Sequence, residues 1–327
     1  MMDANNLFSL THQSDIDGVG SAALIKMNYG LPSKNMFFTD YSVENVTKSA
    51  TAIKKAAKEG AVLIIADFGL NKLIEDQMSG LIDNIKKKKG SVYWFDHHPW
   101  SEEHIRRIAS KCDAAIVNEN AKFCATEIVR NELMLNSKFC KRFAEIVHHC
   151  DFNLMPKEKQ KRDLFIAYGM CITSYNQIKN YQKRCDKLRH AAGVIAAGKF
   201  SDKMMERDAA KFDKMNKERI SDMIKNKLFI LDTVAVGFQK RVQATVAGSE
   251  IIKKSGKDIS IYVNLDNMQG HIRTVKANCT PLAVYLGGGG HPHASGFPVD
   301  KRYNLSKEAD RNKFALFIDK KAAELCR

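Results

Sequence analysis

The sequence predicts an α/β protein in two domains. An N-terminal, mostly parallel sheet with helices on both faces is joined by a linker helix to a smaller C-terminal α/β domain with a mixed sheet. Short apolar runs alternate with amphipathic helical patterns through the first half, which is typical of crossover units. A charged stretch then separates this half from a region of closely spaced strands. The length of 327 residues agrees, because single cores stop growing at about 250–300 residues.

The N-terminal strands are short apolar runs, each bounded by polar or turn-forming residues. They are "LFSLTH" (7–12), "NMFFTDY" (35–41), "AVLIIAD" (61–67), "SVYWFD" (91–96) and "AAIVN" (114–118). Helical patterns follow the first three runs at 21–30, 43–60 and 71–89. In the last of these, Leu73, Ile74, Leu81 and Ile85 fall at helical spacing. From 121 to 200 the pattern is mainly helical, so we expect the first domain to cover 1–200.

The segment 201–226, "SDKMMERDAAKFDKMNKERISDMIKN", mixes acidic and basic residues and contains neither Gly nor Pro. This pattern indicates a solvated linker helix with Met and Phe on its packing side. Strand patterns then follow in "LFILDTVAVGF", "ISIYVNL" and "HIRTVKA". A glycine run and an amphipathic helix (306–325) close the predicted second domain, 227–327.

Composition limits the class of protein. A hydrophobic fraction of 44% and a charged fraction of 27% are ordinary for a soluble globular chain. No apolar run approaches the roughly 18 residues of a membrane span, and the first residues lack the pattern of a signal peptide. The eight cysteines are scattered without a C-x-x-C pair, which favours reduced thiols and a cytoplasmic location over disulfides or a zinc site.

The formal charge of +15 attracts polyanions. It leaves two explanations equally open: binding of nucleic acid or nucleotides, and Lys-rich solvated faces such as "IKKKKG" at 85–90.

Potential metal ligands follow the predicted strands at one edge of the sheet, where open parallel sheets bind ligands. They are His12, Asp15 and Asp17 after the first strand, Asp67 after the third, and Asp96, His97 and His98 in "WFDHHP". Asp151 ends a helix in "VHHCDFN". A single Asp at such a position is more often a cap or turn residue.

Four such clusters at corresponding ends of one sheet need a different explanation. Converging carboxylates repel one another unless cations neutralise them. The sequence therefore predicts a site for two divalent metal ions. Imidazole together with carboxylate favours Mn²⁺, and Mg²⁺ stays open.

The set "HQSDIDGVGS", "ADFG", "DHHP" and "CDF" resembles the four motifs of the DHH phosphoesterases. The later "GGGGHPHASGF" is similar to the signature of the DHH-associated C-terminal domain. The resemblance covers nearly the whole chain in the family's order. One departure is that His12 lies three residues before Asp15, whereas relatives use two or four.

The resemblance implies a role for each of these residues. His12, Asp15 and Asp67 would hold one metal, and Asp17, Asp67, His97 and Asp151 the other, with Asp67 bridging. His98 would contact phosphate or donate a proton, and Asp96 would orient an imidazole. Metal-activated water would attack phosphorus in line. The neighbouring His148 and His149 are expected to be structural rather than catalytic.

In the second domain, the resemblance assigns substrate binding to Arg273 and the glycine run. The residues implied are Arg273, Gly288, Gly289, Gly290 and His291. Glycines let the backbone approach a phosphate or base closely. A flexible glycine hinge with an exposed His is the alternative.

The first functional hypothesis is a nanoRNase or exonuclease that degrades short single-stranded RNA or DNA to 5′-mononucleotides. The basic charge favours an oligonucleotide, and the compact length favours short ones. The second is a phosphoesterase acting on cyclic dinucleotides or 3′-phosphoadenosine 5′-phosphate. The third is a non-catalytic replication or repair partner, which would not need the buried ligand set. The sequence leaves open whether RNA or DNA is preferred and from which end a strand is degraded. It also leaves open whether the chain forms a homodimer and which proteins it binds.

Overall fold

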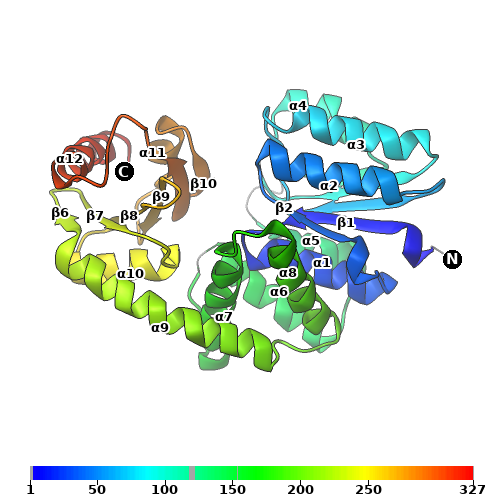
Figure 1. Ribbon diagram of the computed structural model, residues 1–327, viewed down its shortest axis with the longest axis horizontal. Coiled ribbons are helices and arrows are strands. Elements are labelled where there is room, and N and C mark those ends of the chain that lie inside the picture. The colour runs from blue at the N-terminus through cyan, green and yellow to red at the C-terminus, as the bar shows by residue number, and fades with distance from the viewer. Residues whose placement is uncertain (1–2, 118–121, 153, 327) are drawn as a thin grey trace. The chain divides into compact units, whose positions relative to one another are not determined.

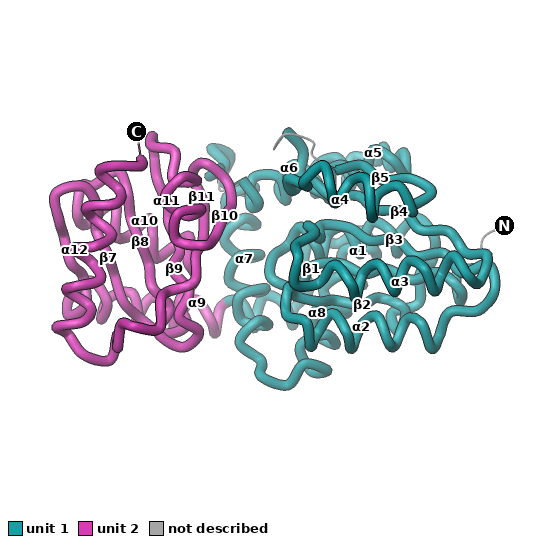
Figure 2. Tube along the Cα trace, turned by 90° about the horizontal axis from the view of Figure 1, so that it is seen from above, with its two compact units in different colours: residues 1–209 teal, residues 210–327 magenta. Residues whose placement is uncertain are grey.

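The structure is a computed structural model that describes residues 3–117, 122–152 and 154–326. The chain divides into two compact units, Met1–Ala209 and Ala210–Arg327 (Figure 2). The division falls inside one continuous helix, α9 (Lys203–Asn226), which forms in the predicted linker segment.

Five parallel strands form the sheet of the first unit, in the order β2-β1-β3-β4-β5. Their bounds are Leu7–His12 (β1), Met36–Thr39 (β2), Val62–Ala66 (β3), Ser91–Phe95 (β4) and Ala114–Ile116 (β5). Every pairing between them is parallel, which confirms the predicted sheet. Asn118, in the fifth predicted strand, lies outside the described residues.

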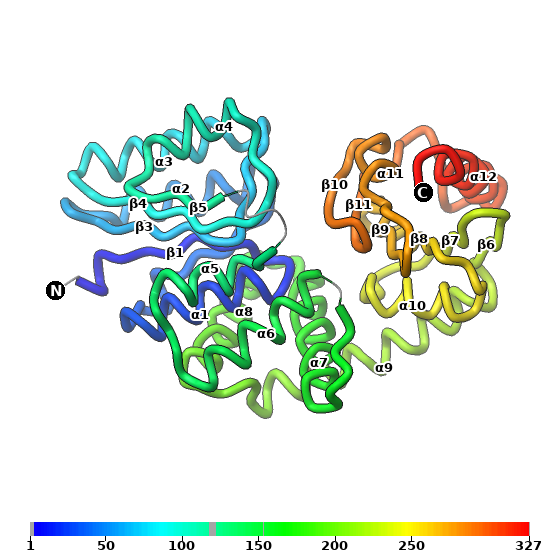
Figure 3. Tube along the Cα trace, turned by 180° about the vertical axis from the view of Figure 1, so that it is seen from behind, coloured from blue at the N-terminus to red at the C-terminus, as the bar shows by residue number. Residues whose placement is uncertain are grey.

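Helices cover both faces of this sheet (Figures 1 and 3). On one side lie α2 (Val43–Ala56), α3 (Glu75–Lys87) and α4 (Glu102–Arg107). On the other lie α1 (Ile16–Tyr29), α5 (Ala125–Glu132), α6 (Lys138–Asp151), α7 (Lys159–Asn176) and α8 (Tyr181–Ala196). Short 3₁₀ turns occur at Ala4–Asn6, Ser33–Asn35 and Ala109–Lys111. Buried Leu63 and Ile65 of β3 share one core with α2 and α3.

The strand order places a ligand-binding position at the centre of the sheet. From β1 the chain moves outward to β2 and then returns to β3, on the other side of β1. The connections on either side of β1 therefore run in opposite directions, which makes the carboxyl ends of β1 and β3 a topological switch point.

Two local expectations are wrong in this unit. Helix α1 begins at Ile16 rather than at 21, because the side chain of Asp15 caps it. Leu73, expected on the packing side of a helix, precedes α3 and is 71% exposed.

The second unit contains a six-stranded sheet in the order β10-β11-β9-β8-β7-β6. The bounds are Leu228–Ile230 (β6), Val234–Gln239 (β7), Ile259–Asn264 (β8), Gln269–Thr274 (β9), Gly289–His291 (β10) and Ala294–Pro298 (β11). Strands β7 and β8 pair in parallel, while the other neighbours are antiparallel. The predicted mixed sheet is confirmed.

Helices also cover both faces of the second sheet. Residues of α9 and α10 (Ala244–Ser255) pack with Ala235 and Tyr262 on one face. Residues of α11 (Thr280–Tyr285) and α12 (Glu308–Leu325) pack with Val236 and Ile261 on the other. The apolar run expected as one strand at 228–238 forms two, because the chain turns between Ile230 and Val234.

No helix within the described ranges is both long enough and apolar enough to cross a membrane.

Candidate metal centre

The first cluster forms where β1 passes into α1. Asp15 is the N-cap of α1, and its Oδ1 accepts hydrogen bonds from the backbone N–H groups of Asp17 and Gly18. Its Oδ2 lies 3.0 Å from Nδ1 of His12. A Cβ atom at Gly18 would lie 2.1 Å from the carbonyl oxygen of His12. Only glycine at this position therefore lets the first turn of α1 lie so close to the end of β1. Asp15 is therefore both a helix cap and a member of the cluster.

Asp17 is buried and is held by a helix distant in sequence. Its two carboxylate oxygens accept hydrogen bonds from the backbone N–H groups of Ala125 and Thr126, at 2.8 and 2.7 Å. These groups belong to the first turn of α5, where the helix dipole favours negative charge. The carboxylate is thus fixed in place by backbone N–H groups.

Asp67 follows β3 and has a left-handed backbone conformation, with φ of 51°. Such a conformation is costly for a residue other than glycine and is often found at functional sites. Its N–H donates to the carbonyl of Phe95, which anchors it to β4, and its Oδ2 accepts no hydrogen bond from the described residues. Burial, and then the carboxylates of Asp15 and Asp17, raise the pKa of Asp67 well above its usual value. The position would bind a cation favourably.

Two groups of ligand atoms share Asp67. In the first, Nδ1 of His12 lies 3.0 Å from Asp15 and 3.7 Å from Oδ2 of Asp67. In the second, Nε2 of His97 lies 3.6 Å from Oδ1 of Asp67, 3.6 Å from Oδ2 of Asp151 and 3.8 Å from Oδ2 of Asp17. Atoms bound about 2.0–2.2 Å from one ion lie about 3–3.6 Å apart, so the separations from His97 lie at or slightly beyond the spacing that one divalent ion requires.

The titration behaviour of the two groups also favours a bound cation. Burial lowers the pKa of His12, but the carboxylates of Asp15 and Asp67 outweigh burial and hold it well above the usual value. Burial raises the pKa of Asp151, and Asp17 and Asp67 raise it further, although His97 opposes them. Carboxylates outnumber imidazoles in both groups, and a divalent ion would balance that charge.

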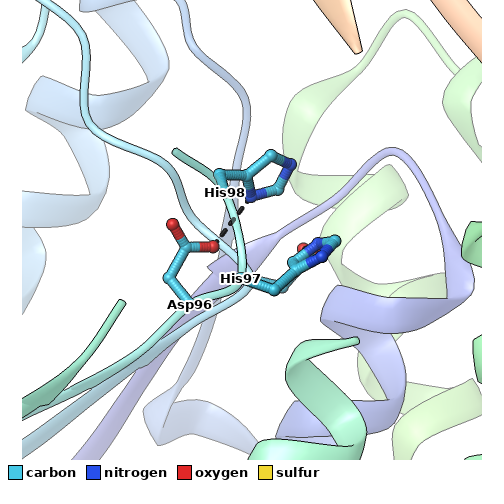
Figure 4. Close-up of side chains that lie close together, drawn as sticks. Asp96, His97 and His98 are labelled. Carbon is cyan, nitrogen blue, oxygen red and sulfur yellow. Dashed lines mark hydrogen bonds and ion pairs between the residues drawn. The ribbon is translucent and has the colours of Figure 1, made fainter. Parts of the chain in front are cut away.

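Asp96 and His98 form a separate pair beside His97 (Figure 4). Oδ1 of Asp96 lies 2.8 Å from Nδ1 of His98, and Oδ2 accepts a hydrogen bond from Nε1 of Trp100 at 2.9 Å. Burial raises the pKa of Asp96, but His98, His97 and Trp100 outweigh burial and lower it. The imidazole that Asp96 orients is therefore that of His98.

Sequence reasoning did not single out Tyr41, which lies next to this centre. Its hydroxyl accepts a hydrogen bond from the N–H of Gly69, and its ring lies 5.2 Å from that of His12. Burial, and then the charges of Asp96 and Asp67, raise the pKa of Tyr41. Its position two residues after β2, at the same sheet edge as the aspartates, is the signal that could have found it.

His148 makes a contact that the sequence does not reveal. Its Nδ1 lies 2.7 Å from Oε2 of Glu127, whose carboxylate also accepts a hydrogen bond from the N–H of Cys124. This pair ties α6 to the first turn of α5, and α6 ends at Asp151. The contact fits the expected structural role of His148.

The expected substrate residues lie in the second unit. His291 pairs with Ala294, and Ala294 pairs with Arg273. Directly opposite residues of antiparallel strands point to the same face, so the side chains of Arg273 and His291 project from one face of the sheet.

Arg273 packs closely against α10. A Cβ atom at Gly248 would lie 2.7 Å from Cγ of Arg273, and Nε of Arg273 is buried with no hydrogen-bond partner among the described residues. Burial lowers the pKa of Arg273 to about 10, which still leaves it charged at neutral pH. An anionic ligand would satisfy the unpaired Nε–H.

The glycine run forms a paired strand. Gly289 and Gly290 pair with Gly296 and Ser295 in β11, which favours a fixed strand over the flexible hinge considered as an alternative. A Cβ atom at Gly288 would lie 1.9 Å from the carbonyl oxygen of Gly296. Only glycine at position 288 therefore lets β11 lie this close to the glycine run.

The fold defined above is shared with solved structures of other proteins, although the sequence matches no protein-family model and no curated protein. A pGpG-specific phosphodiesterase from Vibrio cholerae is 15% identical with a TM-score of 0.51, over 94% of this chain and 97% of that one. An exopolyphosphatase-related protein from Bacteroides fragilis is 13% identical with a TM-score of 0.51, over 97% and 92%.

RecJ from Thermus thermophilus, in complex with Mn²⁺, is 11% identical with a TM-score of 0.51. The match covers 95% of this chain and 52% of RecJ, so this chain spans about half of RecJ's length. These are DHH-superfamily structures, and at such identities the likeness concerns the fold. The fold implied by the DHH motifs is therefore confirmed.

Proposed function

We propose that this chain is a metal-dependent phosphodiesterase of the DHH family. The observation that carries the proposal is the pair of carboxylate–imidazole groups that share Asp67 at the switch point of the sheet. Divalent ions bound there would activate water and stabilise charge on the phosphoryl group. Buried carboxylates in this arrangement have no evident use in a purely structural protein, since they repel one another.

Each ligand is held by its own structural element. His12, Asp15 and Asp67 would bind one ion, and Asp17, Asp67, His97 and Asp151 the other. The N–H groups of α1 fix Asp15, and those of α5 fix Asp17. Such rigid support keeps ligand positions constant during turnover. The imidazoles favour Mn²⁺, with Mg²⁺ as the other candidate.

His98 would act on the substrate rather than on the metal. The carboxylate of Asp96 is hydrogen-bonded to Nδ1 of His98. Nε2 of His98 would then face the phosphoryl group. Burial lowers the pKa of His98, but the Asp96 carboxylate outweighs burial and raises it, so the oriented ring can donate a hydrogen bond or a proton.

We assign short single-stranded oligonucleotides as substrates, with 5′-mononucleotides as products. The charge of +15 favours polyanions. The Vibrio cholerae structure that matches 94% of this chain belongs to an enzyme specific for pGpG, which is itself a linear dinucleotide. Arg273 and His291, on one face of their sheet, would hold a terminal phosphate.

A cyclic dinucleotide or 3′-phosphoadenosine 5′-phosphate is the second candidate substrate. It requires the same metal chemistry and differs only in what the second unit binds. A non-catalytic replication or repair partner is the third candidate, and the ligand set argues against it.

A substrate panel tests the proposal. The purified chain is assayed with Mn²⁺ or Mg²⁺ on RNA and DNA dimers through 20-mers, pGpG, cyclic di-AMP and 3′-phosphoadenosine 5′-phosphate. We expect dimers to pentamers to be hydrolysed at least as fast as 20-mers, and EDTA to abolish activity. Fast hydrolysis of only the cyclic compound or the bisphosphate would establish the second candidate. Activity that survives removal of metal would disprove the metal-dependent mechanism.

A further inference from the structure

The side chain of Tyr41 is held rigidly beside the metal centre. Its ring stacks on that of Phe68, with centroids 4.9 Å apart and planes 5° from parallel. Phe68 is buried and follows the ligand Asp67 directly. Two elements thus fix the phenol: the end of β2, which carries it, and the turn after β3, which supports its ring.

The hydroxyl of Tyr41 lies close to His98, across a glycine. A methyl group built on Gly69 would lie 3.0 Å from Cβ of His98 and 3.5 Å from the Tyr41 oxygen. The phenol and the imidazole therefore flank the same backbone position. A side chain at position 69 would crowd His98.

The phenolic proton is available to a ligand. The Tyr41 oxygen accepts the N–H of Gly69 at 3.1 Å, and no hydrogen bond donated by this hydroxyl occurs among the described residues. A phenol both donates and accepts, and it keeps its proton at neutral pH. The N–H of Gly69 fixes the oxygen, so the free O–H group has a defined position.

We infer that Tyr41 donates a hydrogen bond to a non-bridging oxygen of the substrate's phosphoryl group, as a catalytic residue near His98. This inference rests on the proposed phosphodiesterase function. A fixed donor directed at an oxygen that gains negative charge in the transition state stabilises that state more than the substrate.

A structural role is the alternative, in which the hydroxyl only supports the turn at Gly69. That role predicts that loss of the hydroxyl disturbs Asp67, and with it metal binding. The catalytic role predicts normal metal binding with weakened binding of the phosphoryl group.

The variant Tyr41→Phe separates these roles, because it keeps the ring that stacks on Phe68 and removes only the oxygen. Tyr181→Phe is the matched control. The Tyr181 hydroxyl donates to the carbonyl of Phe38 at 2.6 Å and contacts Ser49, away from the ligand set. Both variants and the parent are compared in bound Mn²⁺, thermal unfolding, dinucleotide kinetics, and affinity for orthovanadate with Mn²⁺ bound.

For Tyr41→Phe we expect kcat/KM to fall about 10- to 100-fold, mainly through kcat, and vanadate to bind more weakly. Mn²⁺ content and Tm should match the parent, and Tyr181→Phe should keep full activity. Parent-like kinetics and vanadate affinity in Tyr41→Phe would overturn the inference, and so would loss of Mn²⁺. A parent that hydrolyses no phosphodiester would instead overturn the proposed function, and this inference with it.

Discussion

At the scale of single residues, the aspartates of the centre have local and long-range roles at once. Asp15 caps the helix that follows it, and Asp17 receives two N–H groups of α5. The ordinary explanation of a strand-end Asp, a helix cap, is therefore correct for Asp15. It does not compete with metal binding, because a carboxylate has about four lone-pair sites for its partners.

Asp67 is the residue on which both ligand groups depend. The variant Asp67→Asn keeps a side chain that tolerates a left-handed backbone and removes the charge. We expect activity to fall by more than about 100-fold, the upper range for loss of an outer partner of a metal ligand, with reduced Mn²⁺ content. Steady-state kinetics and metal analysis would measure both effects.

The exposed carboxylate of Asp300 provides the control, since it lies in the second unit outside the ligand set. Asp300→Ala should resemble the parent. If Asp67→Asn retained activity within tenfold of the parent, the shared ligand would have to be another residue.

His271 is a residue whose protonation should affect stability. Burial, followed by the charge of Arg273, lowers the pKa of His271 to about 3, below the usual 6.5. The folded state therefore disfavours the charged imidazole. The resulting stability is present in full above pH 6.5 and is lost progressively as pH falls from 6.5 toward 3, by on the order of 2 kcal/mol at pH 5.

His271→Phe should remove this dependence while keeping the stacking on Tyr262. NMR titration of the parent would measure the pKa directly, and urea unfolding at pH 8 and pH 5 would compare stabilities. An imidazole signal of His271 that titrates near pH 6.5 would contradict the assignment.

At the scale of elements, the glycine run behaves as an edge strand whose positions differ in what they tolerate. The carbonyl of Gly296 blocks a side chain at Gly288, whereas a Cβ atom at Gly289 meets no atom within 4 Å. Two neighbouring glycines thus form a matched pair of test positions.

Gly288→Ala should push β10 away from β11, at a cost of about 1–3 kcal/mol, the usual range for overpacking. We expect lower thermal stability of the second unit and weaker substrate binding, while Gly289→Ala stays close to the parent. Differential scanning calorimetry and KM measurements would test both variants. A large loss of activity in Gly289→Ala, with little change in Gly288→Ala, would favour a mobile hinge despite the strand pairing.

At the scale of the whole molecule, metal binding should stabilise one unit selectively. All six expected metal ligands, from His12 to Asp151, lie in Met1–Ala209. A ligand that binds only the folded state stabilises it by about 2.7 kcal/mol at 100 times its Kd. For about 200 residues that corresponds to a shift of roughly 5–10 °C.

Calorimetry with and without Mn²⁺ should therefore shift one unfolding transition and leave the other unchanged. The shift should vanish with EDTA and shrink in Asp67→Asn. An equal shift of both transitions would indicate that Mn²⁺ also binds the second unit, contrary to the assignment of ligands.

The parallel sheet of the first unit and the types of side chain at the metal centre could both be predicted from the sequence. Both are local properties: apolar runs such as 61–67 specify buried strands, and short motifs place Asp and His where those strands end. The direction of parallel strands then brings such ends to one edge.

The groups that hold these side chains in place become visible only in the folded chain. Asp17 is bound by N–H groups 108 and 109 residues away, and Tyr41 reaches Gly69 across 28 residues. The glycine run is a strand because β11 pairs with it, and Leu73 is exposed because α3 begins after it. Periodicity within a segment records which of its own residues face a core. It contains no information about which distant backbone group will meet a given side chain, because that depends on how the elements pack.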